Sequence, residues 1–177
     1  RIPVKITLPK KTSNVLIAGK SGSGKSLSGL WYIWQLLRSG ESRIYISDYK
    51  AGEEYENLEN VPAYASGTDA VEVIRDFYQF FTEVRNGRIR LKHHYTLFIK
   101  EWSGLLSYAE TQAKKLKAEL MSKVGELLAV SRGLNMGVFL CVQRADASNF
   151  SSGSREQFQC ILSFGRCSAE QFRMLGF

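Results

Sequence analysis

The chain has 177 residues, of which 44% are hydrophobic, and a formal net charge of +7 at pH 7. This apolar content is enough for one sizeable core, so we expect a single domain over residues 1–177, as part of a longer protein. No apolar run approaches the ~20 residues of a membrane-spanning helix, and three cysteines without a CxxC pair do not form an even disulfide set. The positive charge favours a polyanionic partner without identifying one.

Strand-like and helix-like patterns alternate along the chain. Short apolar, β-branched runs predict strands at residues 14–19, 43–48, 95–99, 138–142 and 159–164. The first helix is predicted from apolar residues at helical spacing, namely Leu27, Leu30, Trp31, Trp34 and Leu37, and it ends at Ser39 and Gly40.

Two further helices and a short terminal one complete the pattern. The second is predicted to open with Thr68 as its N-cap, and the third contains the apolar positions between Leu116 and Leu128. A Ser168 to Gln171 capping-box spacing starts the last helix. Strands that are hydrophobic on both faces and alternate with helices predict an α/β fold, with a mainly parallel sheet covered by helices on both sides.

The stretch "GKSGSGKS" at residues 19–26 satisfies the phosphate-binding pattern GxxxxGK[ST]. Glycines let successive backbone N–H groups point at phosphate oxygens, and a helix that begins near Lys25 adds partial positive charge. Lys25 is expected to reach the β and γ phosphates of ATP, and the Ser26 hydroxyl to ligate Mg²⁺. The residues expected to bind the nucleotide are Gly19, Ser21, Gly22, Ser23, Gly24, Lys25, Ser26 and Leu27.

The stretch "YTLFIKEW" at residues 95–102 predicts the catalytic strand of such a site. In P-loop hydrolases we expect this strand beside the P-loop strand, ending in an Asp that supports Mg²⁺, and in many ATPases a following Glu orients the attacking water. Glu101 suits the water role. Lys100 occupies the Asp position, where an ammonium would repel Mg²⁺ and impair hydrolysis. A solvated lysine at a strand end of shifted register is the alternative.

These motifs together resemble the FtsK/HerA class of DNA-pumping ATPases, with its relatives among the coupling proteins of conjugative elements. Besides the two stretches above, "ISDYKAGE" at 46–53 resembles the Asp-Pro-Lys segment of that class, with Tyr49 at the proline position. Residues 131–150 are similar to the part that holds an arginine finger and, one strand later, a Gln-Arg pair.

The resemblance implies a RecA-like P-loop NTPase that moves double-stranded DNA without sequence preference. Arg132 would then be the finger offered to a neighbouring subunit, and Gln143 the γ-phosphate sensor. The same resemblance implies a homo-oligomeric ring, which would be a hexamer. It also implies a cytoplasmic location, with any membrane tether in a part of the protein outside these residues.

Two other functions stay open at this point. A nucleotide-binding assembly or regulatory subunit that does not hydrolyse ATP is favoured by Lys100. A small-molecule P-loop kinase would need an arginine-bearing lid and an acceptor pocket, neither of which the sequence indicates.

Overall fold

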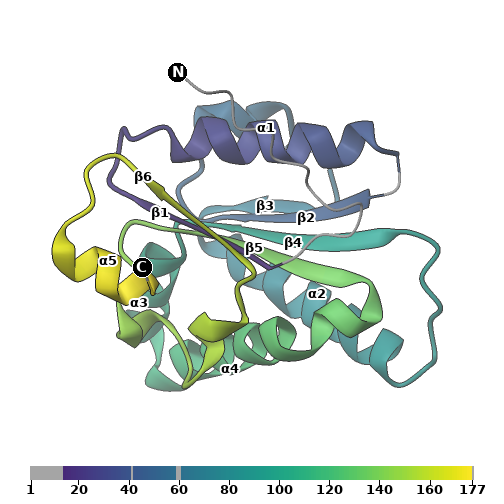
Figure 1. Ribbon diagram of the computed structural model, residues 1–177. Helices are drawn as coiled ribbons and strands as arrows, with labels where there is room; N and C mark the ends of the chain where they lie inside the picture. Colours follow the sequence, from purple (N-terminus) through teal and green to yellow (C-terminus); the bar gives the residue numbers. More distant parts are fainter. Residues whose placement is uncertain (1–13, 41, 59–60, 177) are drawn as a thin grey trace.

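A six-stranded sheet is the framework of the computed structural model, which describes residues 14–40, 42–58 and 61–176 (Figure 1). All neighbouring strands are parallel, in the order β3-β2-β4-β5-β1-β6. The strands are β1 (Val15–Gly19), β2 (Ser42–Asp48), β3 (Tyr64–Ser66), β4 (His94–Lys100), β5 (Met136–Val142) and β6 (Cys160–Phe164). The helices are α1 (Lys25–Arg38), α2 (Ala70–Arg85), α3 (Trp102–Gln112), α4 (Lys114–Val130) and α5 (Ala169–Leu175).

Both faces of the central strands β1, β4 and β5 are buried, as predicted. Along β1, Val15 and Ile17 belong to the core beneath α1, whereas Leu16 and Ala18 belong to the core beneath α2, α3 and α4. Figure 1 shows α1 on one side of the sheet and these three helices on the other. Because side chains alternate along a strand, a strand covered on both faces must be apolar at every position, which explains the run "VLIAG".

The predicted strands and helices are all present, but three further elements were missed. The polar stretch 50–66 contains a 3₁₀-helix (Glu53–Leu58) and the short β3, and α3 follows directly after β4. The predicted N-cap Thr68 is wrong, since α2 begins after Asp69 and has no side-chain cap. The predicted cap of α5 is confirmed, because Ser168 Oγ accepts a hydrogen bond from Gln171 N at 3.2 Å.

Helix α1 buries a different face from the one that its apolar spacing indicates. Its buried residues include Tyr32, Ile33 and Leu36, while Leu27, Trp31, Trp34 and Leu37 are each more than half exposed. Gly29 lies on the buried face, where a Cβ would meet the Phe98 ring at 2.8 Å, so the helix packs closely on β4. Within the described residues, no helix combines the length and apolar character that a bilayer crossing requires.

Asn14 ties the start of β1 to three other segments and is fully buried. Its side-chain Nδ2 donates to Leu128 O at 2.7 Å and to Gln157 O at 3.2 Å, and its Oδ1 accepts from Val138 N at 3.0 Å. Asn14→Ala would leave these buried backbone groups without partners, each at a cost of ~1–3 kcal/mol. We expect urea denaturation to show a loss of about 3 kcal/mol or more in the free energy of unfolding. The exposed Asn86→Ala is the control, and equal stability of both variants would contradict this role.

Candidate nucleotide-binding site

The P-loop runs from the end of β1 at Gly19 to the start of α1 at Lys25. Gly22 and Gly24 have φ values of 75° and 93°, in the left-handed region that favours glycine. At Gly19 the constraint is space, since a Cβ would lie 2.6 Å from Phe164 O in β6. The loop conformation therefore depends on glycine at three of its positions.

A cavity of about 300 Å³ lies over this loop. It is lined by Ser21, Gly22, Gly24, Lys25, Ser26, Leu27, Lys50 and Glu101. Six of the predicted nucleotide-binding residues therefore share one cavity with the predicted catalytic Glu101. Gly19 and Ser23 lie in the loop but do not line the cavity, and the buried Ser23 Oγ has no hydrogen-bond partner among the described residues.

Lys25 is buried at the base of the loop, with 7% of its surface exposed. Its Nζ donates to Gly19 O and, at 2.9 Å, to Lys20 O. Burial lowers the pKa of Lys25, and the carboxylate of Glu101 opposes that shift. A partly desolvated ammonium beside loop N–H groups and a helix N-terminus is suited to phosphate oxygens.

Glu101 and Gln143 meet at the carboxyl ends of neighbouring strands. Gln143 Nε2 donates to Glu101 Oε2 at 3.1 Å, so two residues that are 42 positions apart form one polar pair at the mouth of the site. Glu101 is also the N-cap of α3 in a left-handed conformation, with φ of 57°. This conformation costs a non-glycine residue ~1–2 kcal/mol, and such strain is typical of functional sites.

Strand β4, which is the predicted catalytic strand, does not lie beside β1, which corrects the sequence prediction. Strand β5 lies between them, with Val15 of β1 opposite Phe139, and Phe139 opposite Phe98 of β4. Since all the strands are parallel, the P-loop, Glu101 and Gln143 still meet at the carboxyl edge of the sheet, where ligands of open α/β sheets bind.

Lys100 does not line the P-loop cavity, and it is buried, so the alternative interpretation of a solvated lysine at the strand end is wrong. It is 3% exposed, and its Nζ lies 2.6 Å from Glu54 Oε1 and 3.5 Å from Asp48 Oδ2. The ammonium also lies 4.5 Å from the centre of the Tyr55 ring. Lys100 is therefore held by two carboxylates and an aromatic face, rather than left unpaired beside the nucleotide.

The two carboxylates were missed because they come from distant parts of the chain. Asp48 ends β2 directly opposite Lys100, and it accepts backbone hydrogen bonds from Lys50 N at 3.2 Å and Gly52 N at 2.9 Å. Glu54 follows in the 3₁₀-helix, and its Oε1 accepts a hydrogen bond from Lys100 Nζ at 2.6 Å. Burial would raise the pKa of Glu54, but the hydrogen bond and charge of Lys100, together with the Ser26 hydroxyl, hold it below its usual range.

The donor atoms at this edge fit Mg²⁺. The Ser26 hydroxyl and the Glu101 carboxylate, which both line the cavity, are hard oxygen ligands, which this ion prefers. The described residues contain no cluster of three or more His, Cys, Asp or Glu that would hold a metal ion by themselves. Mg²⁺ is usually bound by one or two carboxylates together with substrate phosphates, so this arrangement suits a metal that arrives with a nucleotide.

Arg132 lies near the amino ends of the strands, whereas the P-loop lies at their carboxyl ends. It is exposed in the 3₁₀-helix Ser131–Leu134, which leads into the amino end of β5. The P-loop follows the carboxyl end of β1, and a strand as long as β5 rises roughly 20 Å. Arg132 therefore does not join the P-loop, Glu101 and Gln143 within one chain.

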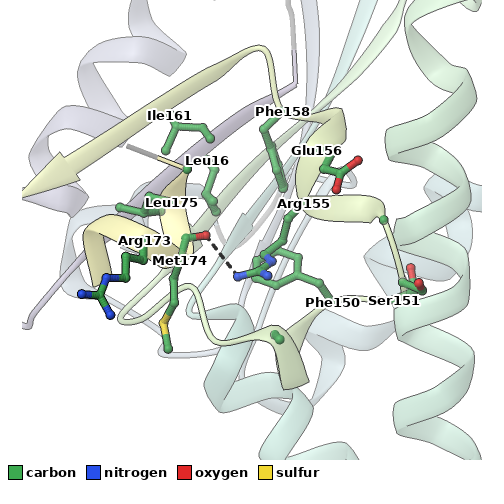
Figure 2. Close-up of a pocket in the computed structure, with 14 residues that line it drawn as sticks. Leu16, Phe150, Ser151, Arg155, Glu156, Phe158, Ile161, Arg173, Met174 and Leu175 are labelled. Atoms are coloured by element: carbon green, nitrogen blue, oxygen red, sulfur yellow. Dashed lines mark hydrogen bonds between the residues drawn. The ribbon is translucent and has the colours of Figure 1, made fainter. Parts of the chain in front are cut away.

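A larger cavity, of about 550 Å³, is separate from the P-loop (Figure 2). It lies between β1, β6, α5 and the segment 147–158, with Phe150, Phe158 and Leu175 among its lining residues. Arg155 crosses it and donates to Met174 O at 3.1 Å, as the dashed line in Figure 2 marks. None of the predicted nucleotide-binding or catalytic residues lines this cavity.

No protein-family model and no curated protein sequence matches this chain. Several solved structures do match it. The conjugation coupling protein TcpA of pCW3, solved with ATPγS, has a TM-score of 0.74 and 22% identity over 97% of this chain and 53% of its own. The chain has a RecA-like P-loop NTPase fold. It spans about half of the TcpA chain.

Two further neighbours have the same architecture. The cytoplasmic domain of EssC has a TM-score of 0.68 and 12% identity over 96% of this chain and 36% of its own. The genome packaging NTPase B204 of Sulfolobus turreted icosahedral virus 2, solved with ATPγS, has a TM-score of 0.58 and 17% identity, over 93% of this chain and 80% of its own. These neighbours are FtsK/HerA-type P-loop ATPases, and at such identities the likeness establishes the fold alone.

Proposed function

We propose that residues 1–177 form the ATP-binding motor domain of a ring-forming translocase of double-stranded DNA. The observation that carries this proposal is the cavity over the P-loop, which Glu101 closes while it accepts a hydrogen bond from Gln143. The loop itself serves to bind the nucleotide phosphates. A carboxylate and an amide paired across two strand ends give, in addition, a means of coupling water activation to the γ-phosphate.

Each residue then has a distinct role. Lys25 and the loop N–H groups bind the phosphates, and Ser26 ligates Mg²⁺, which supplies charge neutralisation when it is bound with ATP. Glu101 orients the attacking water, and Gln143 senses the γ-phosphate through its hydrogen bond to Glu101. Arg132, which is remote from its own P-loop, acts on the nucleotide of the next subunit in a ring, as a hexamer.

A DNA partner is supported by charge and by the neighbours. The net charge of +7 favours a polyanion. TcpA is a conjugation coupling protein, and B204 is a genome packaging NTPase. We infer that this chain works on the same kind of partner, in the cytoplasm.

The experiment that tests this function measures ATP hydrolysis with and without duplex DNA, using Lys25→Ala as the inactive control. DNA-stimulated hydrolysis is the expected result. ATP binding without hydrolysis under any condition would favour the non-hydrolysing assembly or regulatory subunit, for which the lysine at the end of β4 is the supporting observation. Hydrolysis that depends on a small acceptor would favour a kinase instead.

Binding to DNA is expected to be electrostatic and independent of sequence. Each phosphate that is neutralised contributes about −0.9 to the slope of log affinity against log salt. Contact with four phosphates would weaken binding on the order of 100-fold between 50 and 200 mM salt. Fluorescence anisotropy with two duplexes of unrelated sequence and equal length measures this. A flat salt dependence, or a strong preference for one duplex, would contradict it.

A further inference from the structure

Lys50 is a second lysine of the P-loop cavity, and it was not among the predicted nucleotide-binding residues. It lines this cavity together with Lys25 and Glu101, although it comes from the turn after β2 rather than from the P-loop. Two lysines and one glutamate give the lining a net charge of +1. Burial lowers the pKa of Lys25 most, and the positive charge of Lys50 acts in the same direction. A phosphate group that binds in the cavity relieves the repulsion between the two ammonium groups.

The two lysines differ in what their ammonium groups contact. Lys25 Nζ donates to Gly19 O and Lys20 O, so two of its three N–H donors are directed back to the loop. Lys50 is exposed, and none of the residues that the structure describes forms an ion pair with it. Its ammonium therefore has donors for a ligand of the cavity.

The buried carboxylate of Asp48 fixes the turn that carries Lys50. Its Oδ1 accepts a hydrogen bond from Lys50 N at 3.2 Å, and its Oδ2 accepts from Gly52 N at 2.9 Å and lies 3.5 Å from Lys100 Nζ. Ala51 has a φ of 54°, which a non-glycine residue keeps only where its surroundings impose it. A Cβ on Gly52 would collide with the Lys100 ammonium. The lysine that ends β4 therefore helps to hold Lys50 at the cavity.

The order of the strands indicates which phosphate Lys50 reaches. Along the carboxyl edge of the sheet the order is β1, β5, β4 and β2, so the P-loop is followed by Gln143, then Glu101, then Lys50. The loop holds the phosphates at one end of this row, and Glu101 belongs beside the water that attacks the γ-phosphate. Because Lys50 comes after Glu101 in the row and lines the same cavity, the terminal phosphate is the one nearest to it.

We propose that Lys50 binds the γ-phosphate of ATP and makes the site selective for a nucleoside triphosphate over a diphosphate. The inference rests on the proposed function, because the nucleotide is the ligand of the P-loop. The Lys50 ammonium donates charge-assisted hydrogen bonds to γ-phosphate oxygens, while the loop N–H groups bind the phosphates that ATP and ADP share. Hydrolysis then removes the partner of Lys50, which weakens the hold of the site on its product.

Calorimetry of ATPγS binding and of ADP binding tests this inference in the unaltered chain, Lys50→Met, Lys50→Arg and Lys92→Met. Lys92 is the matched control, since it is an exposed lysine that does not line the cavity. In Lys50→Met the affinity for ATPγS should fall about 10–100-fold, as expected for hydrogen bonds to a charged group, while the affinity for ADP changes little. Lys50→Arg keeps the charge and should keep most of the preference for ATPγS.

The comparison of the two nucleotides separates phosphate binding from a merely structural role. Lys50 is exposed, so the free energy of unfolding of Lys50→Met should match that of the unaltered chain. An undiminished preference for ATPγS in Lys50→Met, or an equal loss of affinity for both nucleotides, would overturn this inference alone. Absence of binding of either nucleotide to all four proteins would overturn the proposed function as well.

Discussion

Lys100→Asp is expected to destabilise the chain by about 3–5 kcal/mol. The substitution replaces the Lys100 ammonium, which pairs with the carboxylates of Asp48 and Glu54, with a third carboxylate. The position is only 3% exposed. Breaking a buried ion pair leaves its partners desolvated without compensation, and a domain has only ~5–15 kcal/mol of stability in total. The sequence alone indicates only that an aspartate at this position would support Mg²⁺.

Urea denaturation followed by circular dichroism measures this effect, with Lys100→Met as the control. Methionine removes the charge but keeps most of the volume, so its cost should be smaller than that of aspartate. The deficit of Lys100→Asp should shrink as the pH falls. The crowded carboxylates of the folded variant bind protons more readily than those of the unfolded chain, so protonation favours folding. Unchanged stability of Lys100→Asp would contradict the stabilising role of the buried ion pairs that Lys100 forms with Asp48 and Glu54.

Arg132→Ala is expected to abolish most hydrolysis while ATP binding stays intact. An arginine finger supplied by a neighbour contributes about 10³–10⁵ in rate, because it stabilises the charge on the transferring phosphoryl group. Arg132 is exposed near the amino end of β5, on the side of the sheet away from its own P-loop. A head-to-tail ring would bring this arginine to the nucleotide site of the next subunit. The exposed Arg90→Ala is the control and should keep its activity.

Mixing two inactive proteins tests whether the arginine acts between subunits. In rings that contain Arg132→Ala and Lys25→Ala subunits at equal amounts, about a quarter of the sites combine an intact P-loop with an intact finger from the neighbour. Part of the hydrolysis rate should therefore return when the two are mixed. If the mixture stays as inactive as each variant, under conditions in which the unaltered chain hydrolyses ATP, the assignment between subunits fails.

The parts of the site that the sequence predicts are local in the chain. The P-loop is readable because its glycines, Lys25 and Ser26 lie within one turn and the first residues of one helix. Glu101 and Gln143 each come directly after an apolar strand, and the structure adds that these two strands are neighbours, which brings the two side chains together.

What the sequence did not predict depends on contacts between distant segments. The partners of Lys100 lie 46 and 52 positions away, and only the adjacency of β2 and β4 brings them together. Helix α3 was missed because it begins directly after a buried strand, without a polar side-chain cap to mark its start. On α1, apolar residues cover two faces of the helix, so periodicity indicates a helix but does not decide which face is buried.

The position of β1 in the sheet has a consequence for synthesis of the chain. Its partners in the sheet are β5 and β6, with Val15 opposite Phe139 and Cys160. Both partner residues are synthesised more than a hundred residues after Val15. Until then the apolar strand that precedes the P-loop has no edge to join, and pairings of such long range form slowly and expose chains to aggregation. A nucleotide can therefore stabilise the fold only after β5 and β6 have been synthesised. Amino-terminal fragments that lack these strands would carry the phosphate-binding motif but would not form the nucleotide-binding site.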